Sequence, residues 1–161
     1  MVEFRKAGIT DALTIIQTRQ KVWNATYRGI YPDEVIDEFD YDWHLIAEQN
    51  RLKNPNFHCF MVIDRDKCVG YFSYGPARRG FRLHSLYLLP AYRRSGLGRV
   101  IFERVKSACI GAGFNGMYLD CHPDNHNALG FYQYMGGTIT SIDSGHQNRQ
   151  EDCCTVEFRF T

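Results

Sequence analysis

One segment most constrains how this chain can fold. In it, a strand ends at a proline, and a basic loop with two glycines then leads into an amphipathic helix. The segment reads Leu86-Tyr87-Leu88-Leu89-Pro90-Ala91-Tyr92-Arg93-Arg94-Ser95-Gly96-Leu97-Gly98-Arg99. A helix that starts near Leu97 points free backbone N–H groups at its own start, where the helix dipole adds roughly half a positive charge. Glycine lets backbone approach a ligand without a Cβ in the way. With the arginines beside it, this loop predicts a pyrophosphate site.

Three kinds of phosphate loop compete for this segment. The G-x-x-x-x-G-K-[ST] pattern of a P-loop does not occur in the chain. A dinucleotide fingerprint needs a third glycine, and Gly96-x-Gly98 continues instead to Ile101. The remaining form is Arg93-x-x-Gly96-x-Gly98, opening a helix directly after a strand. A strand–helix turn with merely solvated arginines is the alternative that the loop alone leaves open.

Length and charge limit the classes of protein. With 161 residues, of which 44% are hydrophobic, the chain is expected to form a single domain over residues 1–161. A net charge of +1 without a long basic run does not indicate a nucleic-acid partner. The apolar runs are shorter than the ~20 residues that cross a bilayer, and the N-terminus lacks a signal-peptide layout. We therefore expect a cytoplasmic protein without a membrane partner.

The cysteines and histidines do not predict a metal site. The 6 cysteines form no C-x-x-C pair, and most lie in apolar periodic segments, where a free thiol acts as a small hydrophobe. Cys153 and Cys154 are expected on opposite faces of one strand. His122 and His126 have helical metal-ligand spacing, but Pro123 interrupts the helix that this spacing would need.

The order of elements predicts an α+β fold. A strand at 2–4 precedes a helix at 11–25 capped by Thr10, and a second helical stretch runs from Pro32 towards Ile46. The later elements are strands at 57–63, 68–74 and 81–88, a helix at 97–109, a strand at 117–121, a short helix capped by Asp124 or Asn125, and strands at 138–142 and 153–160. This mixed order indicates a sheet with helices on its faces.

Two motifs in register resemble the GNAT superfamily of N-acetyltransferases, which use acetyl-coenzyme A. The first is the Arg93-x-x-Gly96-x-Gly98 loop after Leu86-Tyr87-Leu88. The second is Asn125-x-x-Ala128-x-x-Phe131-Tyr132, ending at Gly136-Gly137, where the family usually has an aromatic residue at the position of Gly137. The resemblance covers residues ~55–140 by motif. It implies a mixed, mostly antiparallel central sheet of six to seven strands with helices on both faces.

The resemblance also implies where acetyl-CoA binds. The backbone of Leu86, Tyr87 and Leu88 would pair with the pantetheine arm, as an added strand does. The segment of Arg93, Arg94, Ser95, Gly96, Leu97, Gly98 and Arg99 would hold the pyrophosphate. Asn125 would contact the pantetheine from the other side. Tyr132 would both contact the cofactor and donate a proton to the departing thiolate, whereas its position alone favours a core tyrosine without a catalytic role.

The acceptor amine needs a base, because an amine with a pKa of ~10.4 is almost fully protonated at pH 7. Asp120, at the end of its strand, is the first candidate, and a strand-end aspartate that caps the next turn is the alternative. His84 is the second candidate and is expected to share a strand face with Arg82, Leu86 and Leu88. Many family members have a glutamate where this chain has Arg82, which weakens a base on that strand. The Leu88 amide would polarise the acetyl carbonyl.

The resemblance implies that the first two helices build the acceptor site. Trp23, Tyr27 and Tyr31, with the acidic stretch Asp33–Asp42, suit a cationic amine. A small molecule, a polyamine or a peptide N-terminus would all fit, while Arg78, Arg79 and Arg82 could equally bind an acidic substrate. A solvated acidic helix face remains the alternative for most of the carboxylates.

We therefore predict an N-acetyltransferase that moves an acetyl group directly from acetyl-CoA to a primary amine. A non-catalytic acyl-CoA-binding or sensor domain on the same fold is the alternative, and a nucleotide-binding protein is a third hypothesis. The sequence leaves a homodimer open.

Overall fold

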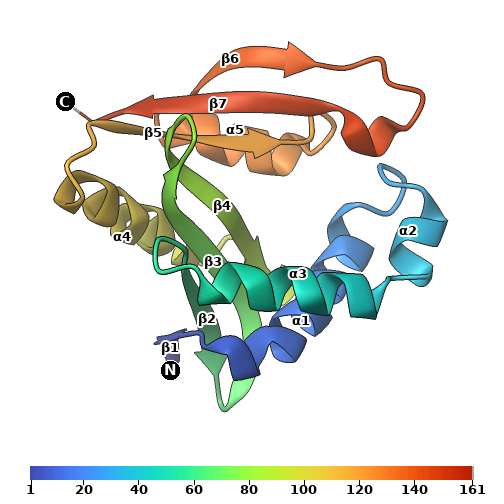
Figure 1. Ribbon diagram of the computed structural model, residues 1–161. Coiled ribbons are helices and arrows are strands. Elements are labelled where there is room, and N and C mark those ends of the chain that lie inside the picture. The colour runs from blue at the N-terminus through green and yellow to red at the C-terminus, as the bar shows by residue number, and fades with distance from the viewer. Residues whose placement is uncertain (161) are drawn as a thin grey trace.

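The computed structural model describes residues 1–160 and contains a seven-stranded sheet in the order β1-β2-β3-β4-β5-β7-β6 (Figure 1). Neighbouring strands are antiparallel except for β4 and β5, which are parallel. The strands are β1 (Val2–Lys6), β2 (His58–Asp64), β3 (Lys67–Ala77), β4 (Gly80–Leu88), β5 (Gly116–Cys121), β6 (Thr138–Asp143) and β7 (Cys153–Arg159).

Helices cover both faces of the sheet. They are α1 (Ala12–Thr26), α2 (Asp33–Asp37), α3 (Tyr41–Lys53), α4 (Leu97–Gly111) and α5 (His126–Tyr134), with short 3-10 turns η1 (Ile9–Asp11), η2 (Pro90–Tyr92) and η3 (Arg149–Glu151). One core cluster joins Ile15 of α1 to Met61 and Tyr71 of β2 and β3. The larger cluster joins α4 and α5 to the opposite face of the sheet. Figure 1 shows α1 and α3 together at the bottom, with β5, β7 and β6 at the top.

These observations confirm the expected fold class, a mostly antiparallel α+β sheet with helices on both faces. Two local predictions were wrong. Thr10 does not cap α1, because a 3-10 turn precedes that helix and the Asp11 side chain accepts from the Gly8 N–H at 2.8 Å. The second helical stretch is divided into α2 and α3, because Asp40 caps a new helix by accepting from the Trp43 N–H at 3.0 Å. No helix within residues 1–160 is long and apolar enough to cross a membrane.

A buried ion pair fixes α3 and α1 against the sheet. Arg19 of α1 contacts Glu48 of α3, whose side chain is 1% exposed, and its Nε donates to the Tyr71 hydroxyl of β3 at 2.8 Å. A second arginine, Arg51, donates to Glu48 at 3.1 Å. Burial of these charges is tolerable because each is paired and hydrogen-bonded.

The centre of the sheet is irregular where β4 leaves its neighbours. Ser73 pairs with Ser85, whereas the next residue of β3, Tyr74, pairs with Leu83, so His84 is an extra residue in β4. Such a bulge bends its strand and increases the local twist. On its other side, β4 meets β5 at one register position, Arg82 opposite Tyr118. Beyond it the two strands part.

The site of Gly137, where the resembled family has an aromatic residue, is filled by β7. A Cβ at Gly137 would lie 2.6 Å from Val156 Cγ1 and 2.9 Å from the Phe158 ring. The two β7 side chains therefore occupy the space that a larger residue would need.

We predict that Gly137→Ala lowers the free energy of unfolding by about 1–3 kcal/mol, because it overpacks this contact. Urea unfolding followed by circular dichroism measures the change. Gly130→Ala is the matched control, since a Cβ at Gly130 of α5 meets nothing within 4 Å. Equal stability of the two variants would contradict the packing argument.

Candidate active site

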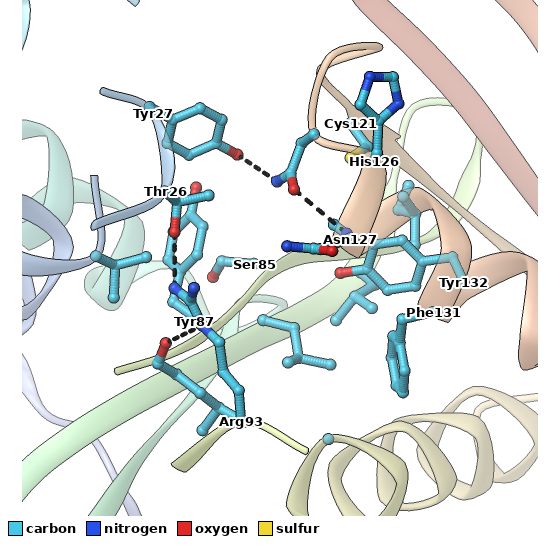
Figure 2. A pocket seen from close by; sticks show the side chains of 18 of the residues that line it. Thr26, Tyr27, Ser85, Tyr87, Arg93, Cys121, His126, Asn127, Phe131 and Tyr132 are labelled. Atoms are coloured by element: carbon cyan, nitrogen blue, oxygen red, sulfur yellow. Dashed lines mark hydrogen bonds between the residues drawn. The ribbon is translucent and has the colours of Figure 1, made fainter. Parts of the chain in front are cut away.

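The gap between β4 and β5 opens into a cleft of about 810 Å³. Its walls come from the end of α1, the second half of β4, the loop before α4, the end of β5 and the start of α5. Figure 2 shows that the side chains of Tyr27, Tyr87, Arg93 and Tyr132 surround this space. Segments distant in sequence therefore meet at one site.

The last residues of β4 present free backbone groups to the cleft. The Leu89 N–H donates to Val69 O of β3 at 2.9 Å. Because hydrogen-bonding direction alternates along a strand, the N–H and C=O of Leu88 point away from β3, towards the gap. The Arg93 Nε donates to that Leu88 carbonyl at 2.9 Å. The Leu88 N–H remains on the same side, available to a ligand that lies along the strand.

The loop before α4 has the form of an anion cradle. Gly96 caps the helix with a φ of 84°, a conformation that glycine adopts without strain. A Cβ at Gly98 would lie 3.4 Å from the Phe131 ring, so glycine keeps the loop close to α5. The loop residues that line the cleft are Arg93, Arg94, Gly96, Gly98 and Arg99.

Ser95 and Leu97 lie on a different side of this loop from the cleft. They line a smaller hollow beside Val2 and Tyr92. The Ser95 hydroxyl donates to Tyr92 O at 2.9 Å. Any contact between these two residues and a ligand in the cleft would therefore come from their backbone.

Arg93 is tied to the protein by its side chain. In addition to its bond to Leu88, the guanidinium donates to the Thr26 hydroxyl at 2.7 Å (Figure 2). This contact joins the loop to the end of α1. Of the arginines in the loop, Arg94 and Arg99 are therefore the ones left to place positive charge at a bound phosphate.

The cleft fits the acetyl-CoA that the sequence led us to expect. A helix start with two glycines suits the pyrophosphate, and the open edge of β4 suits the amides of a pantetheine arm. The fit rests on the Gly98–Phe131 contact and the direction of the Leu88 N–H, both described above.

Tyr132 of α5 occupies the inner end of the cleft. Its side chain is 8% exposed, and Figure 2 shows the hydroxyl directed into the open space. Burial raises the pKa of Tyr132 above its ordinary value, and Cys121 and Tyr87 nearby add to the effect. The phenol is therefore protonated at neutral pH and can donate.

Asn125 links the two walls of the cleft. Its carbonyl oxygen caps α5 by accepting from the Ala128 N–H at 3.3 Å, as predicted for one of the two capping candidates. Its amide donates to the Tyr27 hydroxyl at 3.3 Å (Figure 2). The end of α1 is thus bound to α5 as well as to the loop.

Of the three aromatic residues predicted for the acceptor, Tyr27 reaches the cleft. Tyr31 stacks on Tyr27 with a centroid distance of 4.2 Å, and Trp23 meets the Tyr31 ring edge-on at 5.4 Å. Trp23 and Tyr31 therefore support Tyr27 from behind. In the acidic stretch, Asp33 and Asp37 bind Arg28 at 3.2 and 2.9 Å.

Asp120 lies on the cleft wall and is strongly engaged. Its carboxylate accepts from the Thr155 hydroxyl at 2.9 Å. Arg79 and Arg82 approach the same carboxylate at 3.3 and 3.4 Å. These contacts fix the orientation of the carboxylate and occupy part of its hydrogen-bonding capacity.

His84 also lines the cleft, but its predicted strand face was wrong. The β4 bulge reverses the alternation after His84, so Leu86 and Leu88 pack in the cluster with α4, while Tyr87 packs in the cluster with α1. Burial, with Arg82 and Arg51 nearby, lowers the pKa of His84 to about 4. The ring is neutral at pH 7, and its low pKa makes it a weak base.

Several cleft residues were missed by the sequence analysis. Ser85 and Thr26 line the cleft between β4 and α1, and Asn127 and Cys121 line it near Tyr132 (Figure 2). A bulge leaves no clear trace in a short apolar strand, so Ser85 gave no signal. Asn127 lies inside the second motif and could have been chosen by its position one turn before Phe131.

Comparisons with known proteins found related sequences and folds. A family model described as the acetyltransferase (GNAT) family matches residues 17–136. A spermidine N(1)-acetyltransferase of Thermoplasma acidophilum is 24% identical over 147 residues, covering 88% of this chain and 91% of the relative.

Solved structures share the fold. A PaiA N-acetyltransferase from Thermoplasma acidophilum in complex with coenzyme A has a TM-score of 0.79 at 21% identity, covering 99% of both chains. An acetyltransferase from Thermus thermophilus has a TM-score of 0.74 at 14% identity, covering 99% of this chain and 97% of the other.

We predict that the imidazole of His84 stays neutral from pH 8 down to pH 5.5, because its pKa is lowered to about 4. Nitrogen-15 NMR of the histidine rings measures this titration. His84→Gln removes only the His84 signal and so assigns it. An inflection between pH 6 and 7 assigned to His84 would contradict the burial of this ring.

Proposed function

This chain belongs to the acetyltransferase (GNAT) family and is an N-acetyltransferase that uses acetyl-CoA, and we propose that it transfers the acetyl group directly to a primary amine. The observation that carries this proposal is the open edge of β4 between an anion cradle and the Tyr132 hydroxyl. Direct transfer needs no acyl-carrying nucleophile. Cys121, the cysteine at the cleft, has its pKa raised to about 12 by burial and is a poor thiolate at neutral pH.

The backbone and the loop would hold and orient the acetyl donor. Leu86, Tyr87 and Leu88 would align the pantetheine, with Asn125 opposite, and Arg93 to Arg99 would hold the pyrophosphate. The Leu88 N–H would donate to the acetyl carbonyl oxygen, where negative charge develops during attack. A fixed backbone donor costs little reorganisation at that moment, because β3 and Arg93 already hold its strand.

Tyr132 would supply the proton that the leaving thiolate needs. A phenol ordinarily has a pKa of ~10 and a thiol ~8.5, and burial keeps Tyr132 protonated. For the amine proton we propose Asp120, His84 or a water molecule. Asp120 is the acid on the cleft wall but is held by two arginines. His84 is neutral, but its pKa of about 4 makes it a weak base.

The acceptor candidates are a polyamine, another small aminated molecule and a peptide N-terminus, with Tyr27 on the acceptor wall, backed by Trp23 and Tyr31. The name of the Thermoplasma relative makes spermidine the first polyamine to test. The cysteines of the described residues are free, which fits the cytoplasmic location that we propose.

We predict that Tyr132→Phe lowers kcat by about 10²–10⁴-fold, because the general acid is removed while the ring stays in place. The KM for acetyl-CoA should change much less. CoA release over a panel of amines, amino acids, aminoglycosides and peptides measures both. Tyr134→Phe is the control, because Tyr134 also lines the cleft from the same helix but is 78% exposed. If acetyl-CoA binds, no amine is acetylated and Tyr132→Phe changes nothing, the protein is a non-catalytic CoA-binding domain.

Comparing Asp120→Asn with His84→Gln identifies the base. We predict that replacing the residue that acts as the base lowers kcat/KM by at least about 10²-fold. Replacing the other residue should have a smaller effect. Asp124→Asn is the matched control, because Asp124 also lines the cleft but pairs with Arg149.

The pH dependence of kcat/KM in the wild-type enzyme provides a second test of the base. The acceptor amine must lose a proton, so kcat/KM should rise with pH from 6 to 9. No break is expected near 6.5, because His84 is already neutral there. A break near 6.5 that disappears in His84→Gln would contradict this assignment.

A further inference from the structure

Two arginines contact Asp120, which lines the cleft, although neither arginine lines the cleft itself. The Nη2 of Arg79 lies 3.3 Å and the Nη2 of Arg82 lies 3.4 Å from the same carboxylate oxygen. Both guanidiniums also lie over the Tyr118 ring, at 4.4 and 5.9 Å from its centre. Tyr118 and Asp120 are two residues apart on β5, so their side chains lie on the same face of the sheet. Their contacts therefore hold the two guanidinium groups side by side over that face.

The carboxylates around this pair are largely committed elsewhere. Asp124 binds Arg149, and Glu48 is buried against Arg19 and Arg51. Glu157, opposite Tyr118 on β7, is not paired with either arginine within residues 1–160. Among the described residues, Asp120 is therefore the carboxylate that pairs with both arginines. Burial is the main cause of the lowered pKa of His84, and the positive charge of Arg82 adds to it.

The arginines keep donors for a ligand. Arg79 is 57% exposed and Arg82 is 34% exposed, and each reaches Asp120 through one terminal nitrogen. The Nε of Arg82 also has no partner among the described residues, but it is buried, so the donors open to a ligand are the terminal nitrogens. A guanidinium has five N–H donors in a planar fork that matches a carboxylate, so each arginine can bind a second carboxylate beside Asp120.

We propose that Arg79 and Arg82 select the acceptor by binding its carboxylate, so that the preferred acceptor is a primary amine that also carries a carboxylate. The inference rests on the proposed transfer to a primary amine and names the class of amine. Asp120 then positions the arginines in addition to any part in proton removal. A polyamine, which carries only positive charges, meets like charge at these two arginines and is acetylated less well.

The test compares amines that differ only in that group. The panel contains alanine, β-alanine and 4-aminobutanoate, the carboxamide of each, and spermidine, with kcat/KM measured by CoA release. We expect the best carboxylate to exceed its carboxamide by about tenfold or more, as for a charge-assisted hydrogen bond. Arg82→Ala and Arg79→Ala should reduce this ratio towards one, and Arg82→Lys should restore part of it.

Arg159→Ala is the matched control. It removes the same charge from the same sheet, at the Gly116 end of β5 and away from the cleft. It should keep the full preference for the carboxylate. Arg79→Ala alters an exposed side chain, so it remains informative if Arg82→Ala folds poorly.

Failure of the carboxylate inference and failure of the proposed function would give different results. Efficient acetylation of spermidine or the carboxamides, with no preference for the carboxylates, overturns the inference and leaves the proposed function intact. Binding of acetyl-CoA without acetylation of any amine overturns the proposed function. In that case, calorimetry still tests the carboxylate site by comparing how tightly the carboxylates and the carboxamides bind the CoA complex. Equal affinity of the two, or a preference for the carboxylate that Arg82→Ala leaves unchanged, overturns the carboxylate site.

Discussion

The separation of β4 from β5 is the constraint on which the rest of the site depends. The two parallel strands meet at Arg82 and Tyr118, and the extra residue His84 then bends β4 away. In a continuous sheet, the Leu88 N–H would be used by a neighbouring strand. In this protein the Leu88 N–H is left free for a ligand. A bound ligand would supply the hydrogen bonds that β5 does not make to this part of β4. Every catalytic group that we propose lies along the sides of this gap.

Contacts across the gap hold it in shape. Arg93 joins the β4 edge to Thr26 of α1, and Tyr27 of α1 joins Asn125 of α5. The end of α1 is therefore attached to both walls. Below it, the buried Arg19–Glu48 pair fixes α1 to α3 and to the sheet. The polar interactions of the N-terminal half thus serve to position a backbone edge and a phenol.

The sequence was sufficient for the fold class and for the positions of α4 and α5, because these depend on local patterns. Periodicity locates helices and strands, and Asn125 was a capping candidate by residue type alone. The sequence was insufficient where a contact joins distant segments. The bulge that changes the face of His84, the arginines that engage Asp120 and the attachment of Arg93 to Thr26 each depend on tertiary partners. Trp23 and Tyr31 have the composition of a ligand cage but pack behind Tyr27.

Amide hydrogen exchange at Leu88, with and without coenzyme A, tests the central claim most directly. The account predicts that the Leu88 N–H exchanges faster than the Leu89 N–H in the free protein, because only Leu89 is bonded to Val69. Saturating coenzyme A should slow exchange at Leu88 and leave Leu89 nearly unchanged. Unchanged exchange at Leu88 in the saturated complex would contradict the claim that the open edge of β4 binds the pantetheine arm.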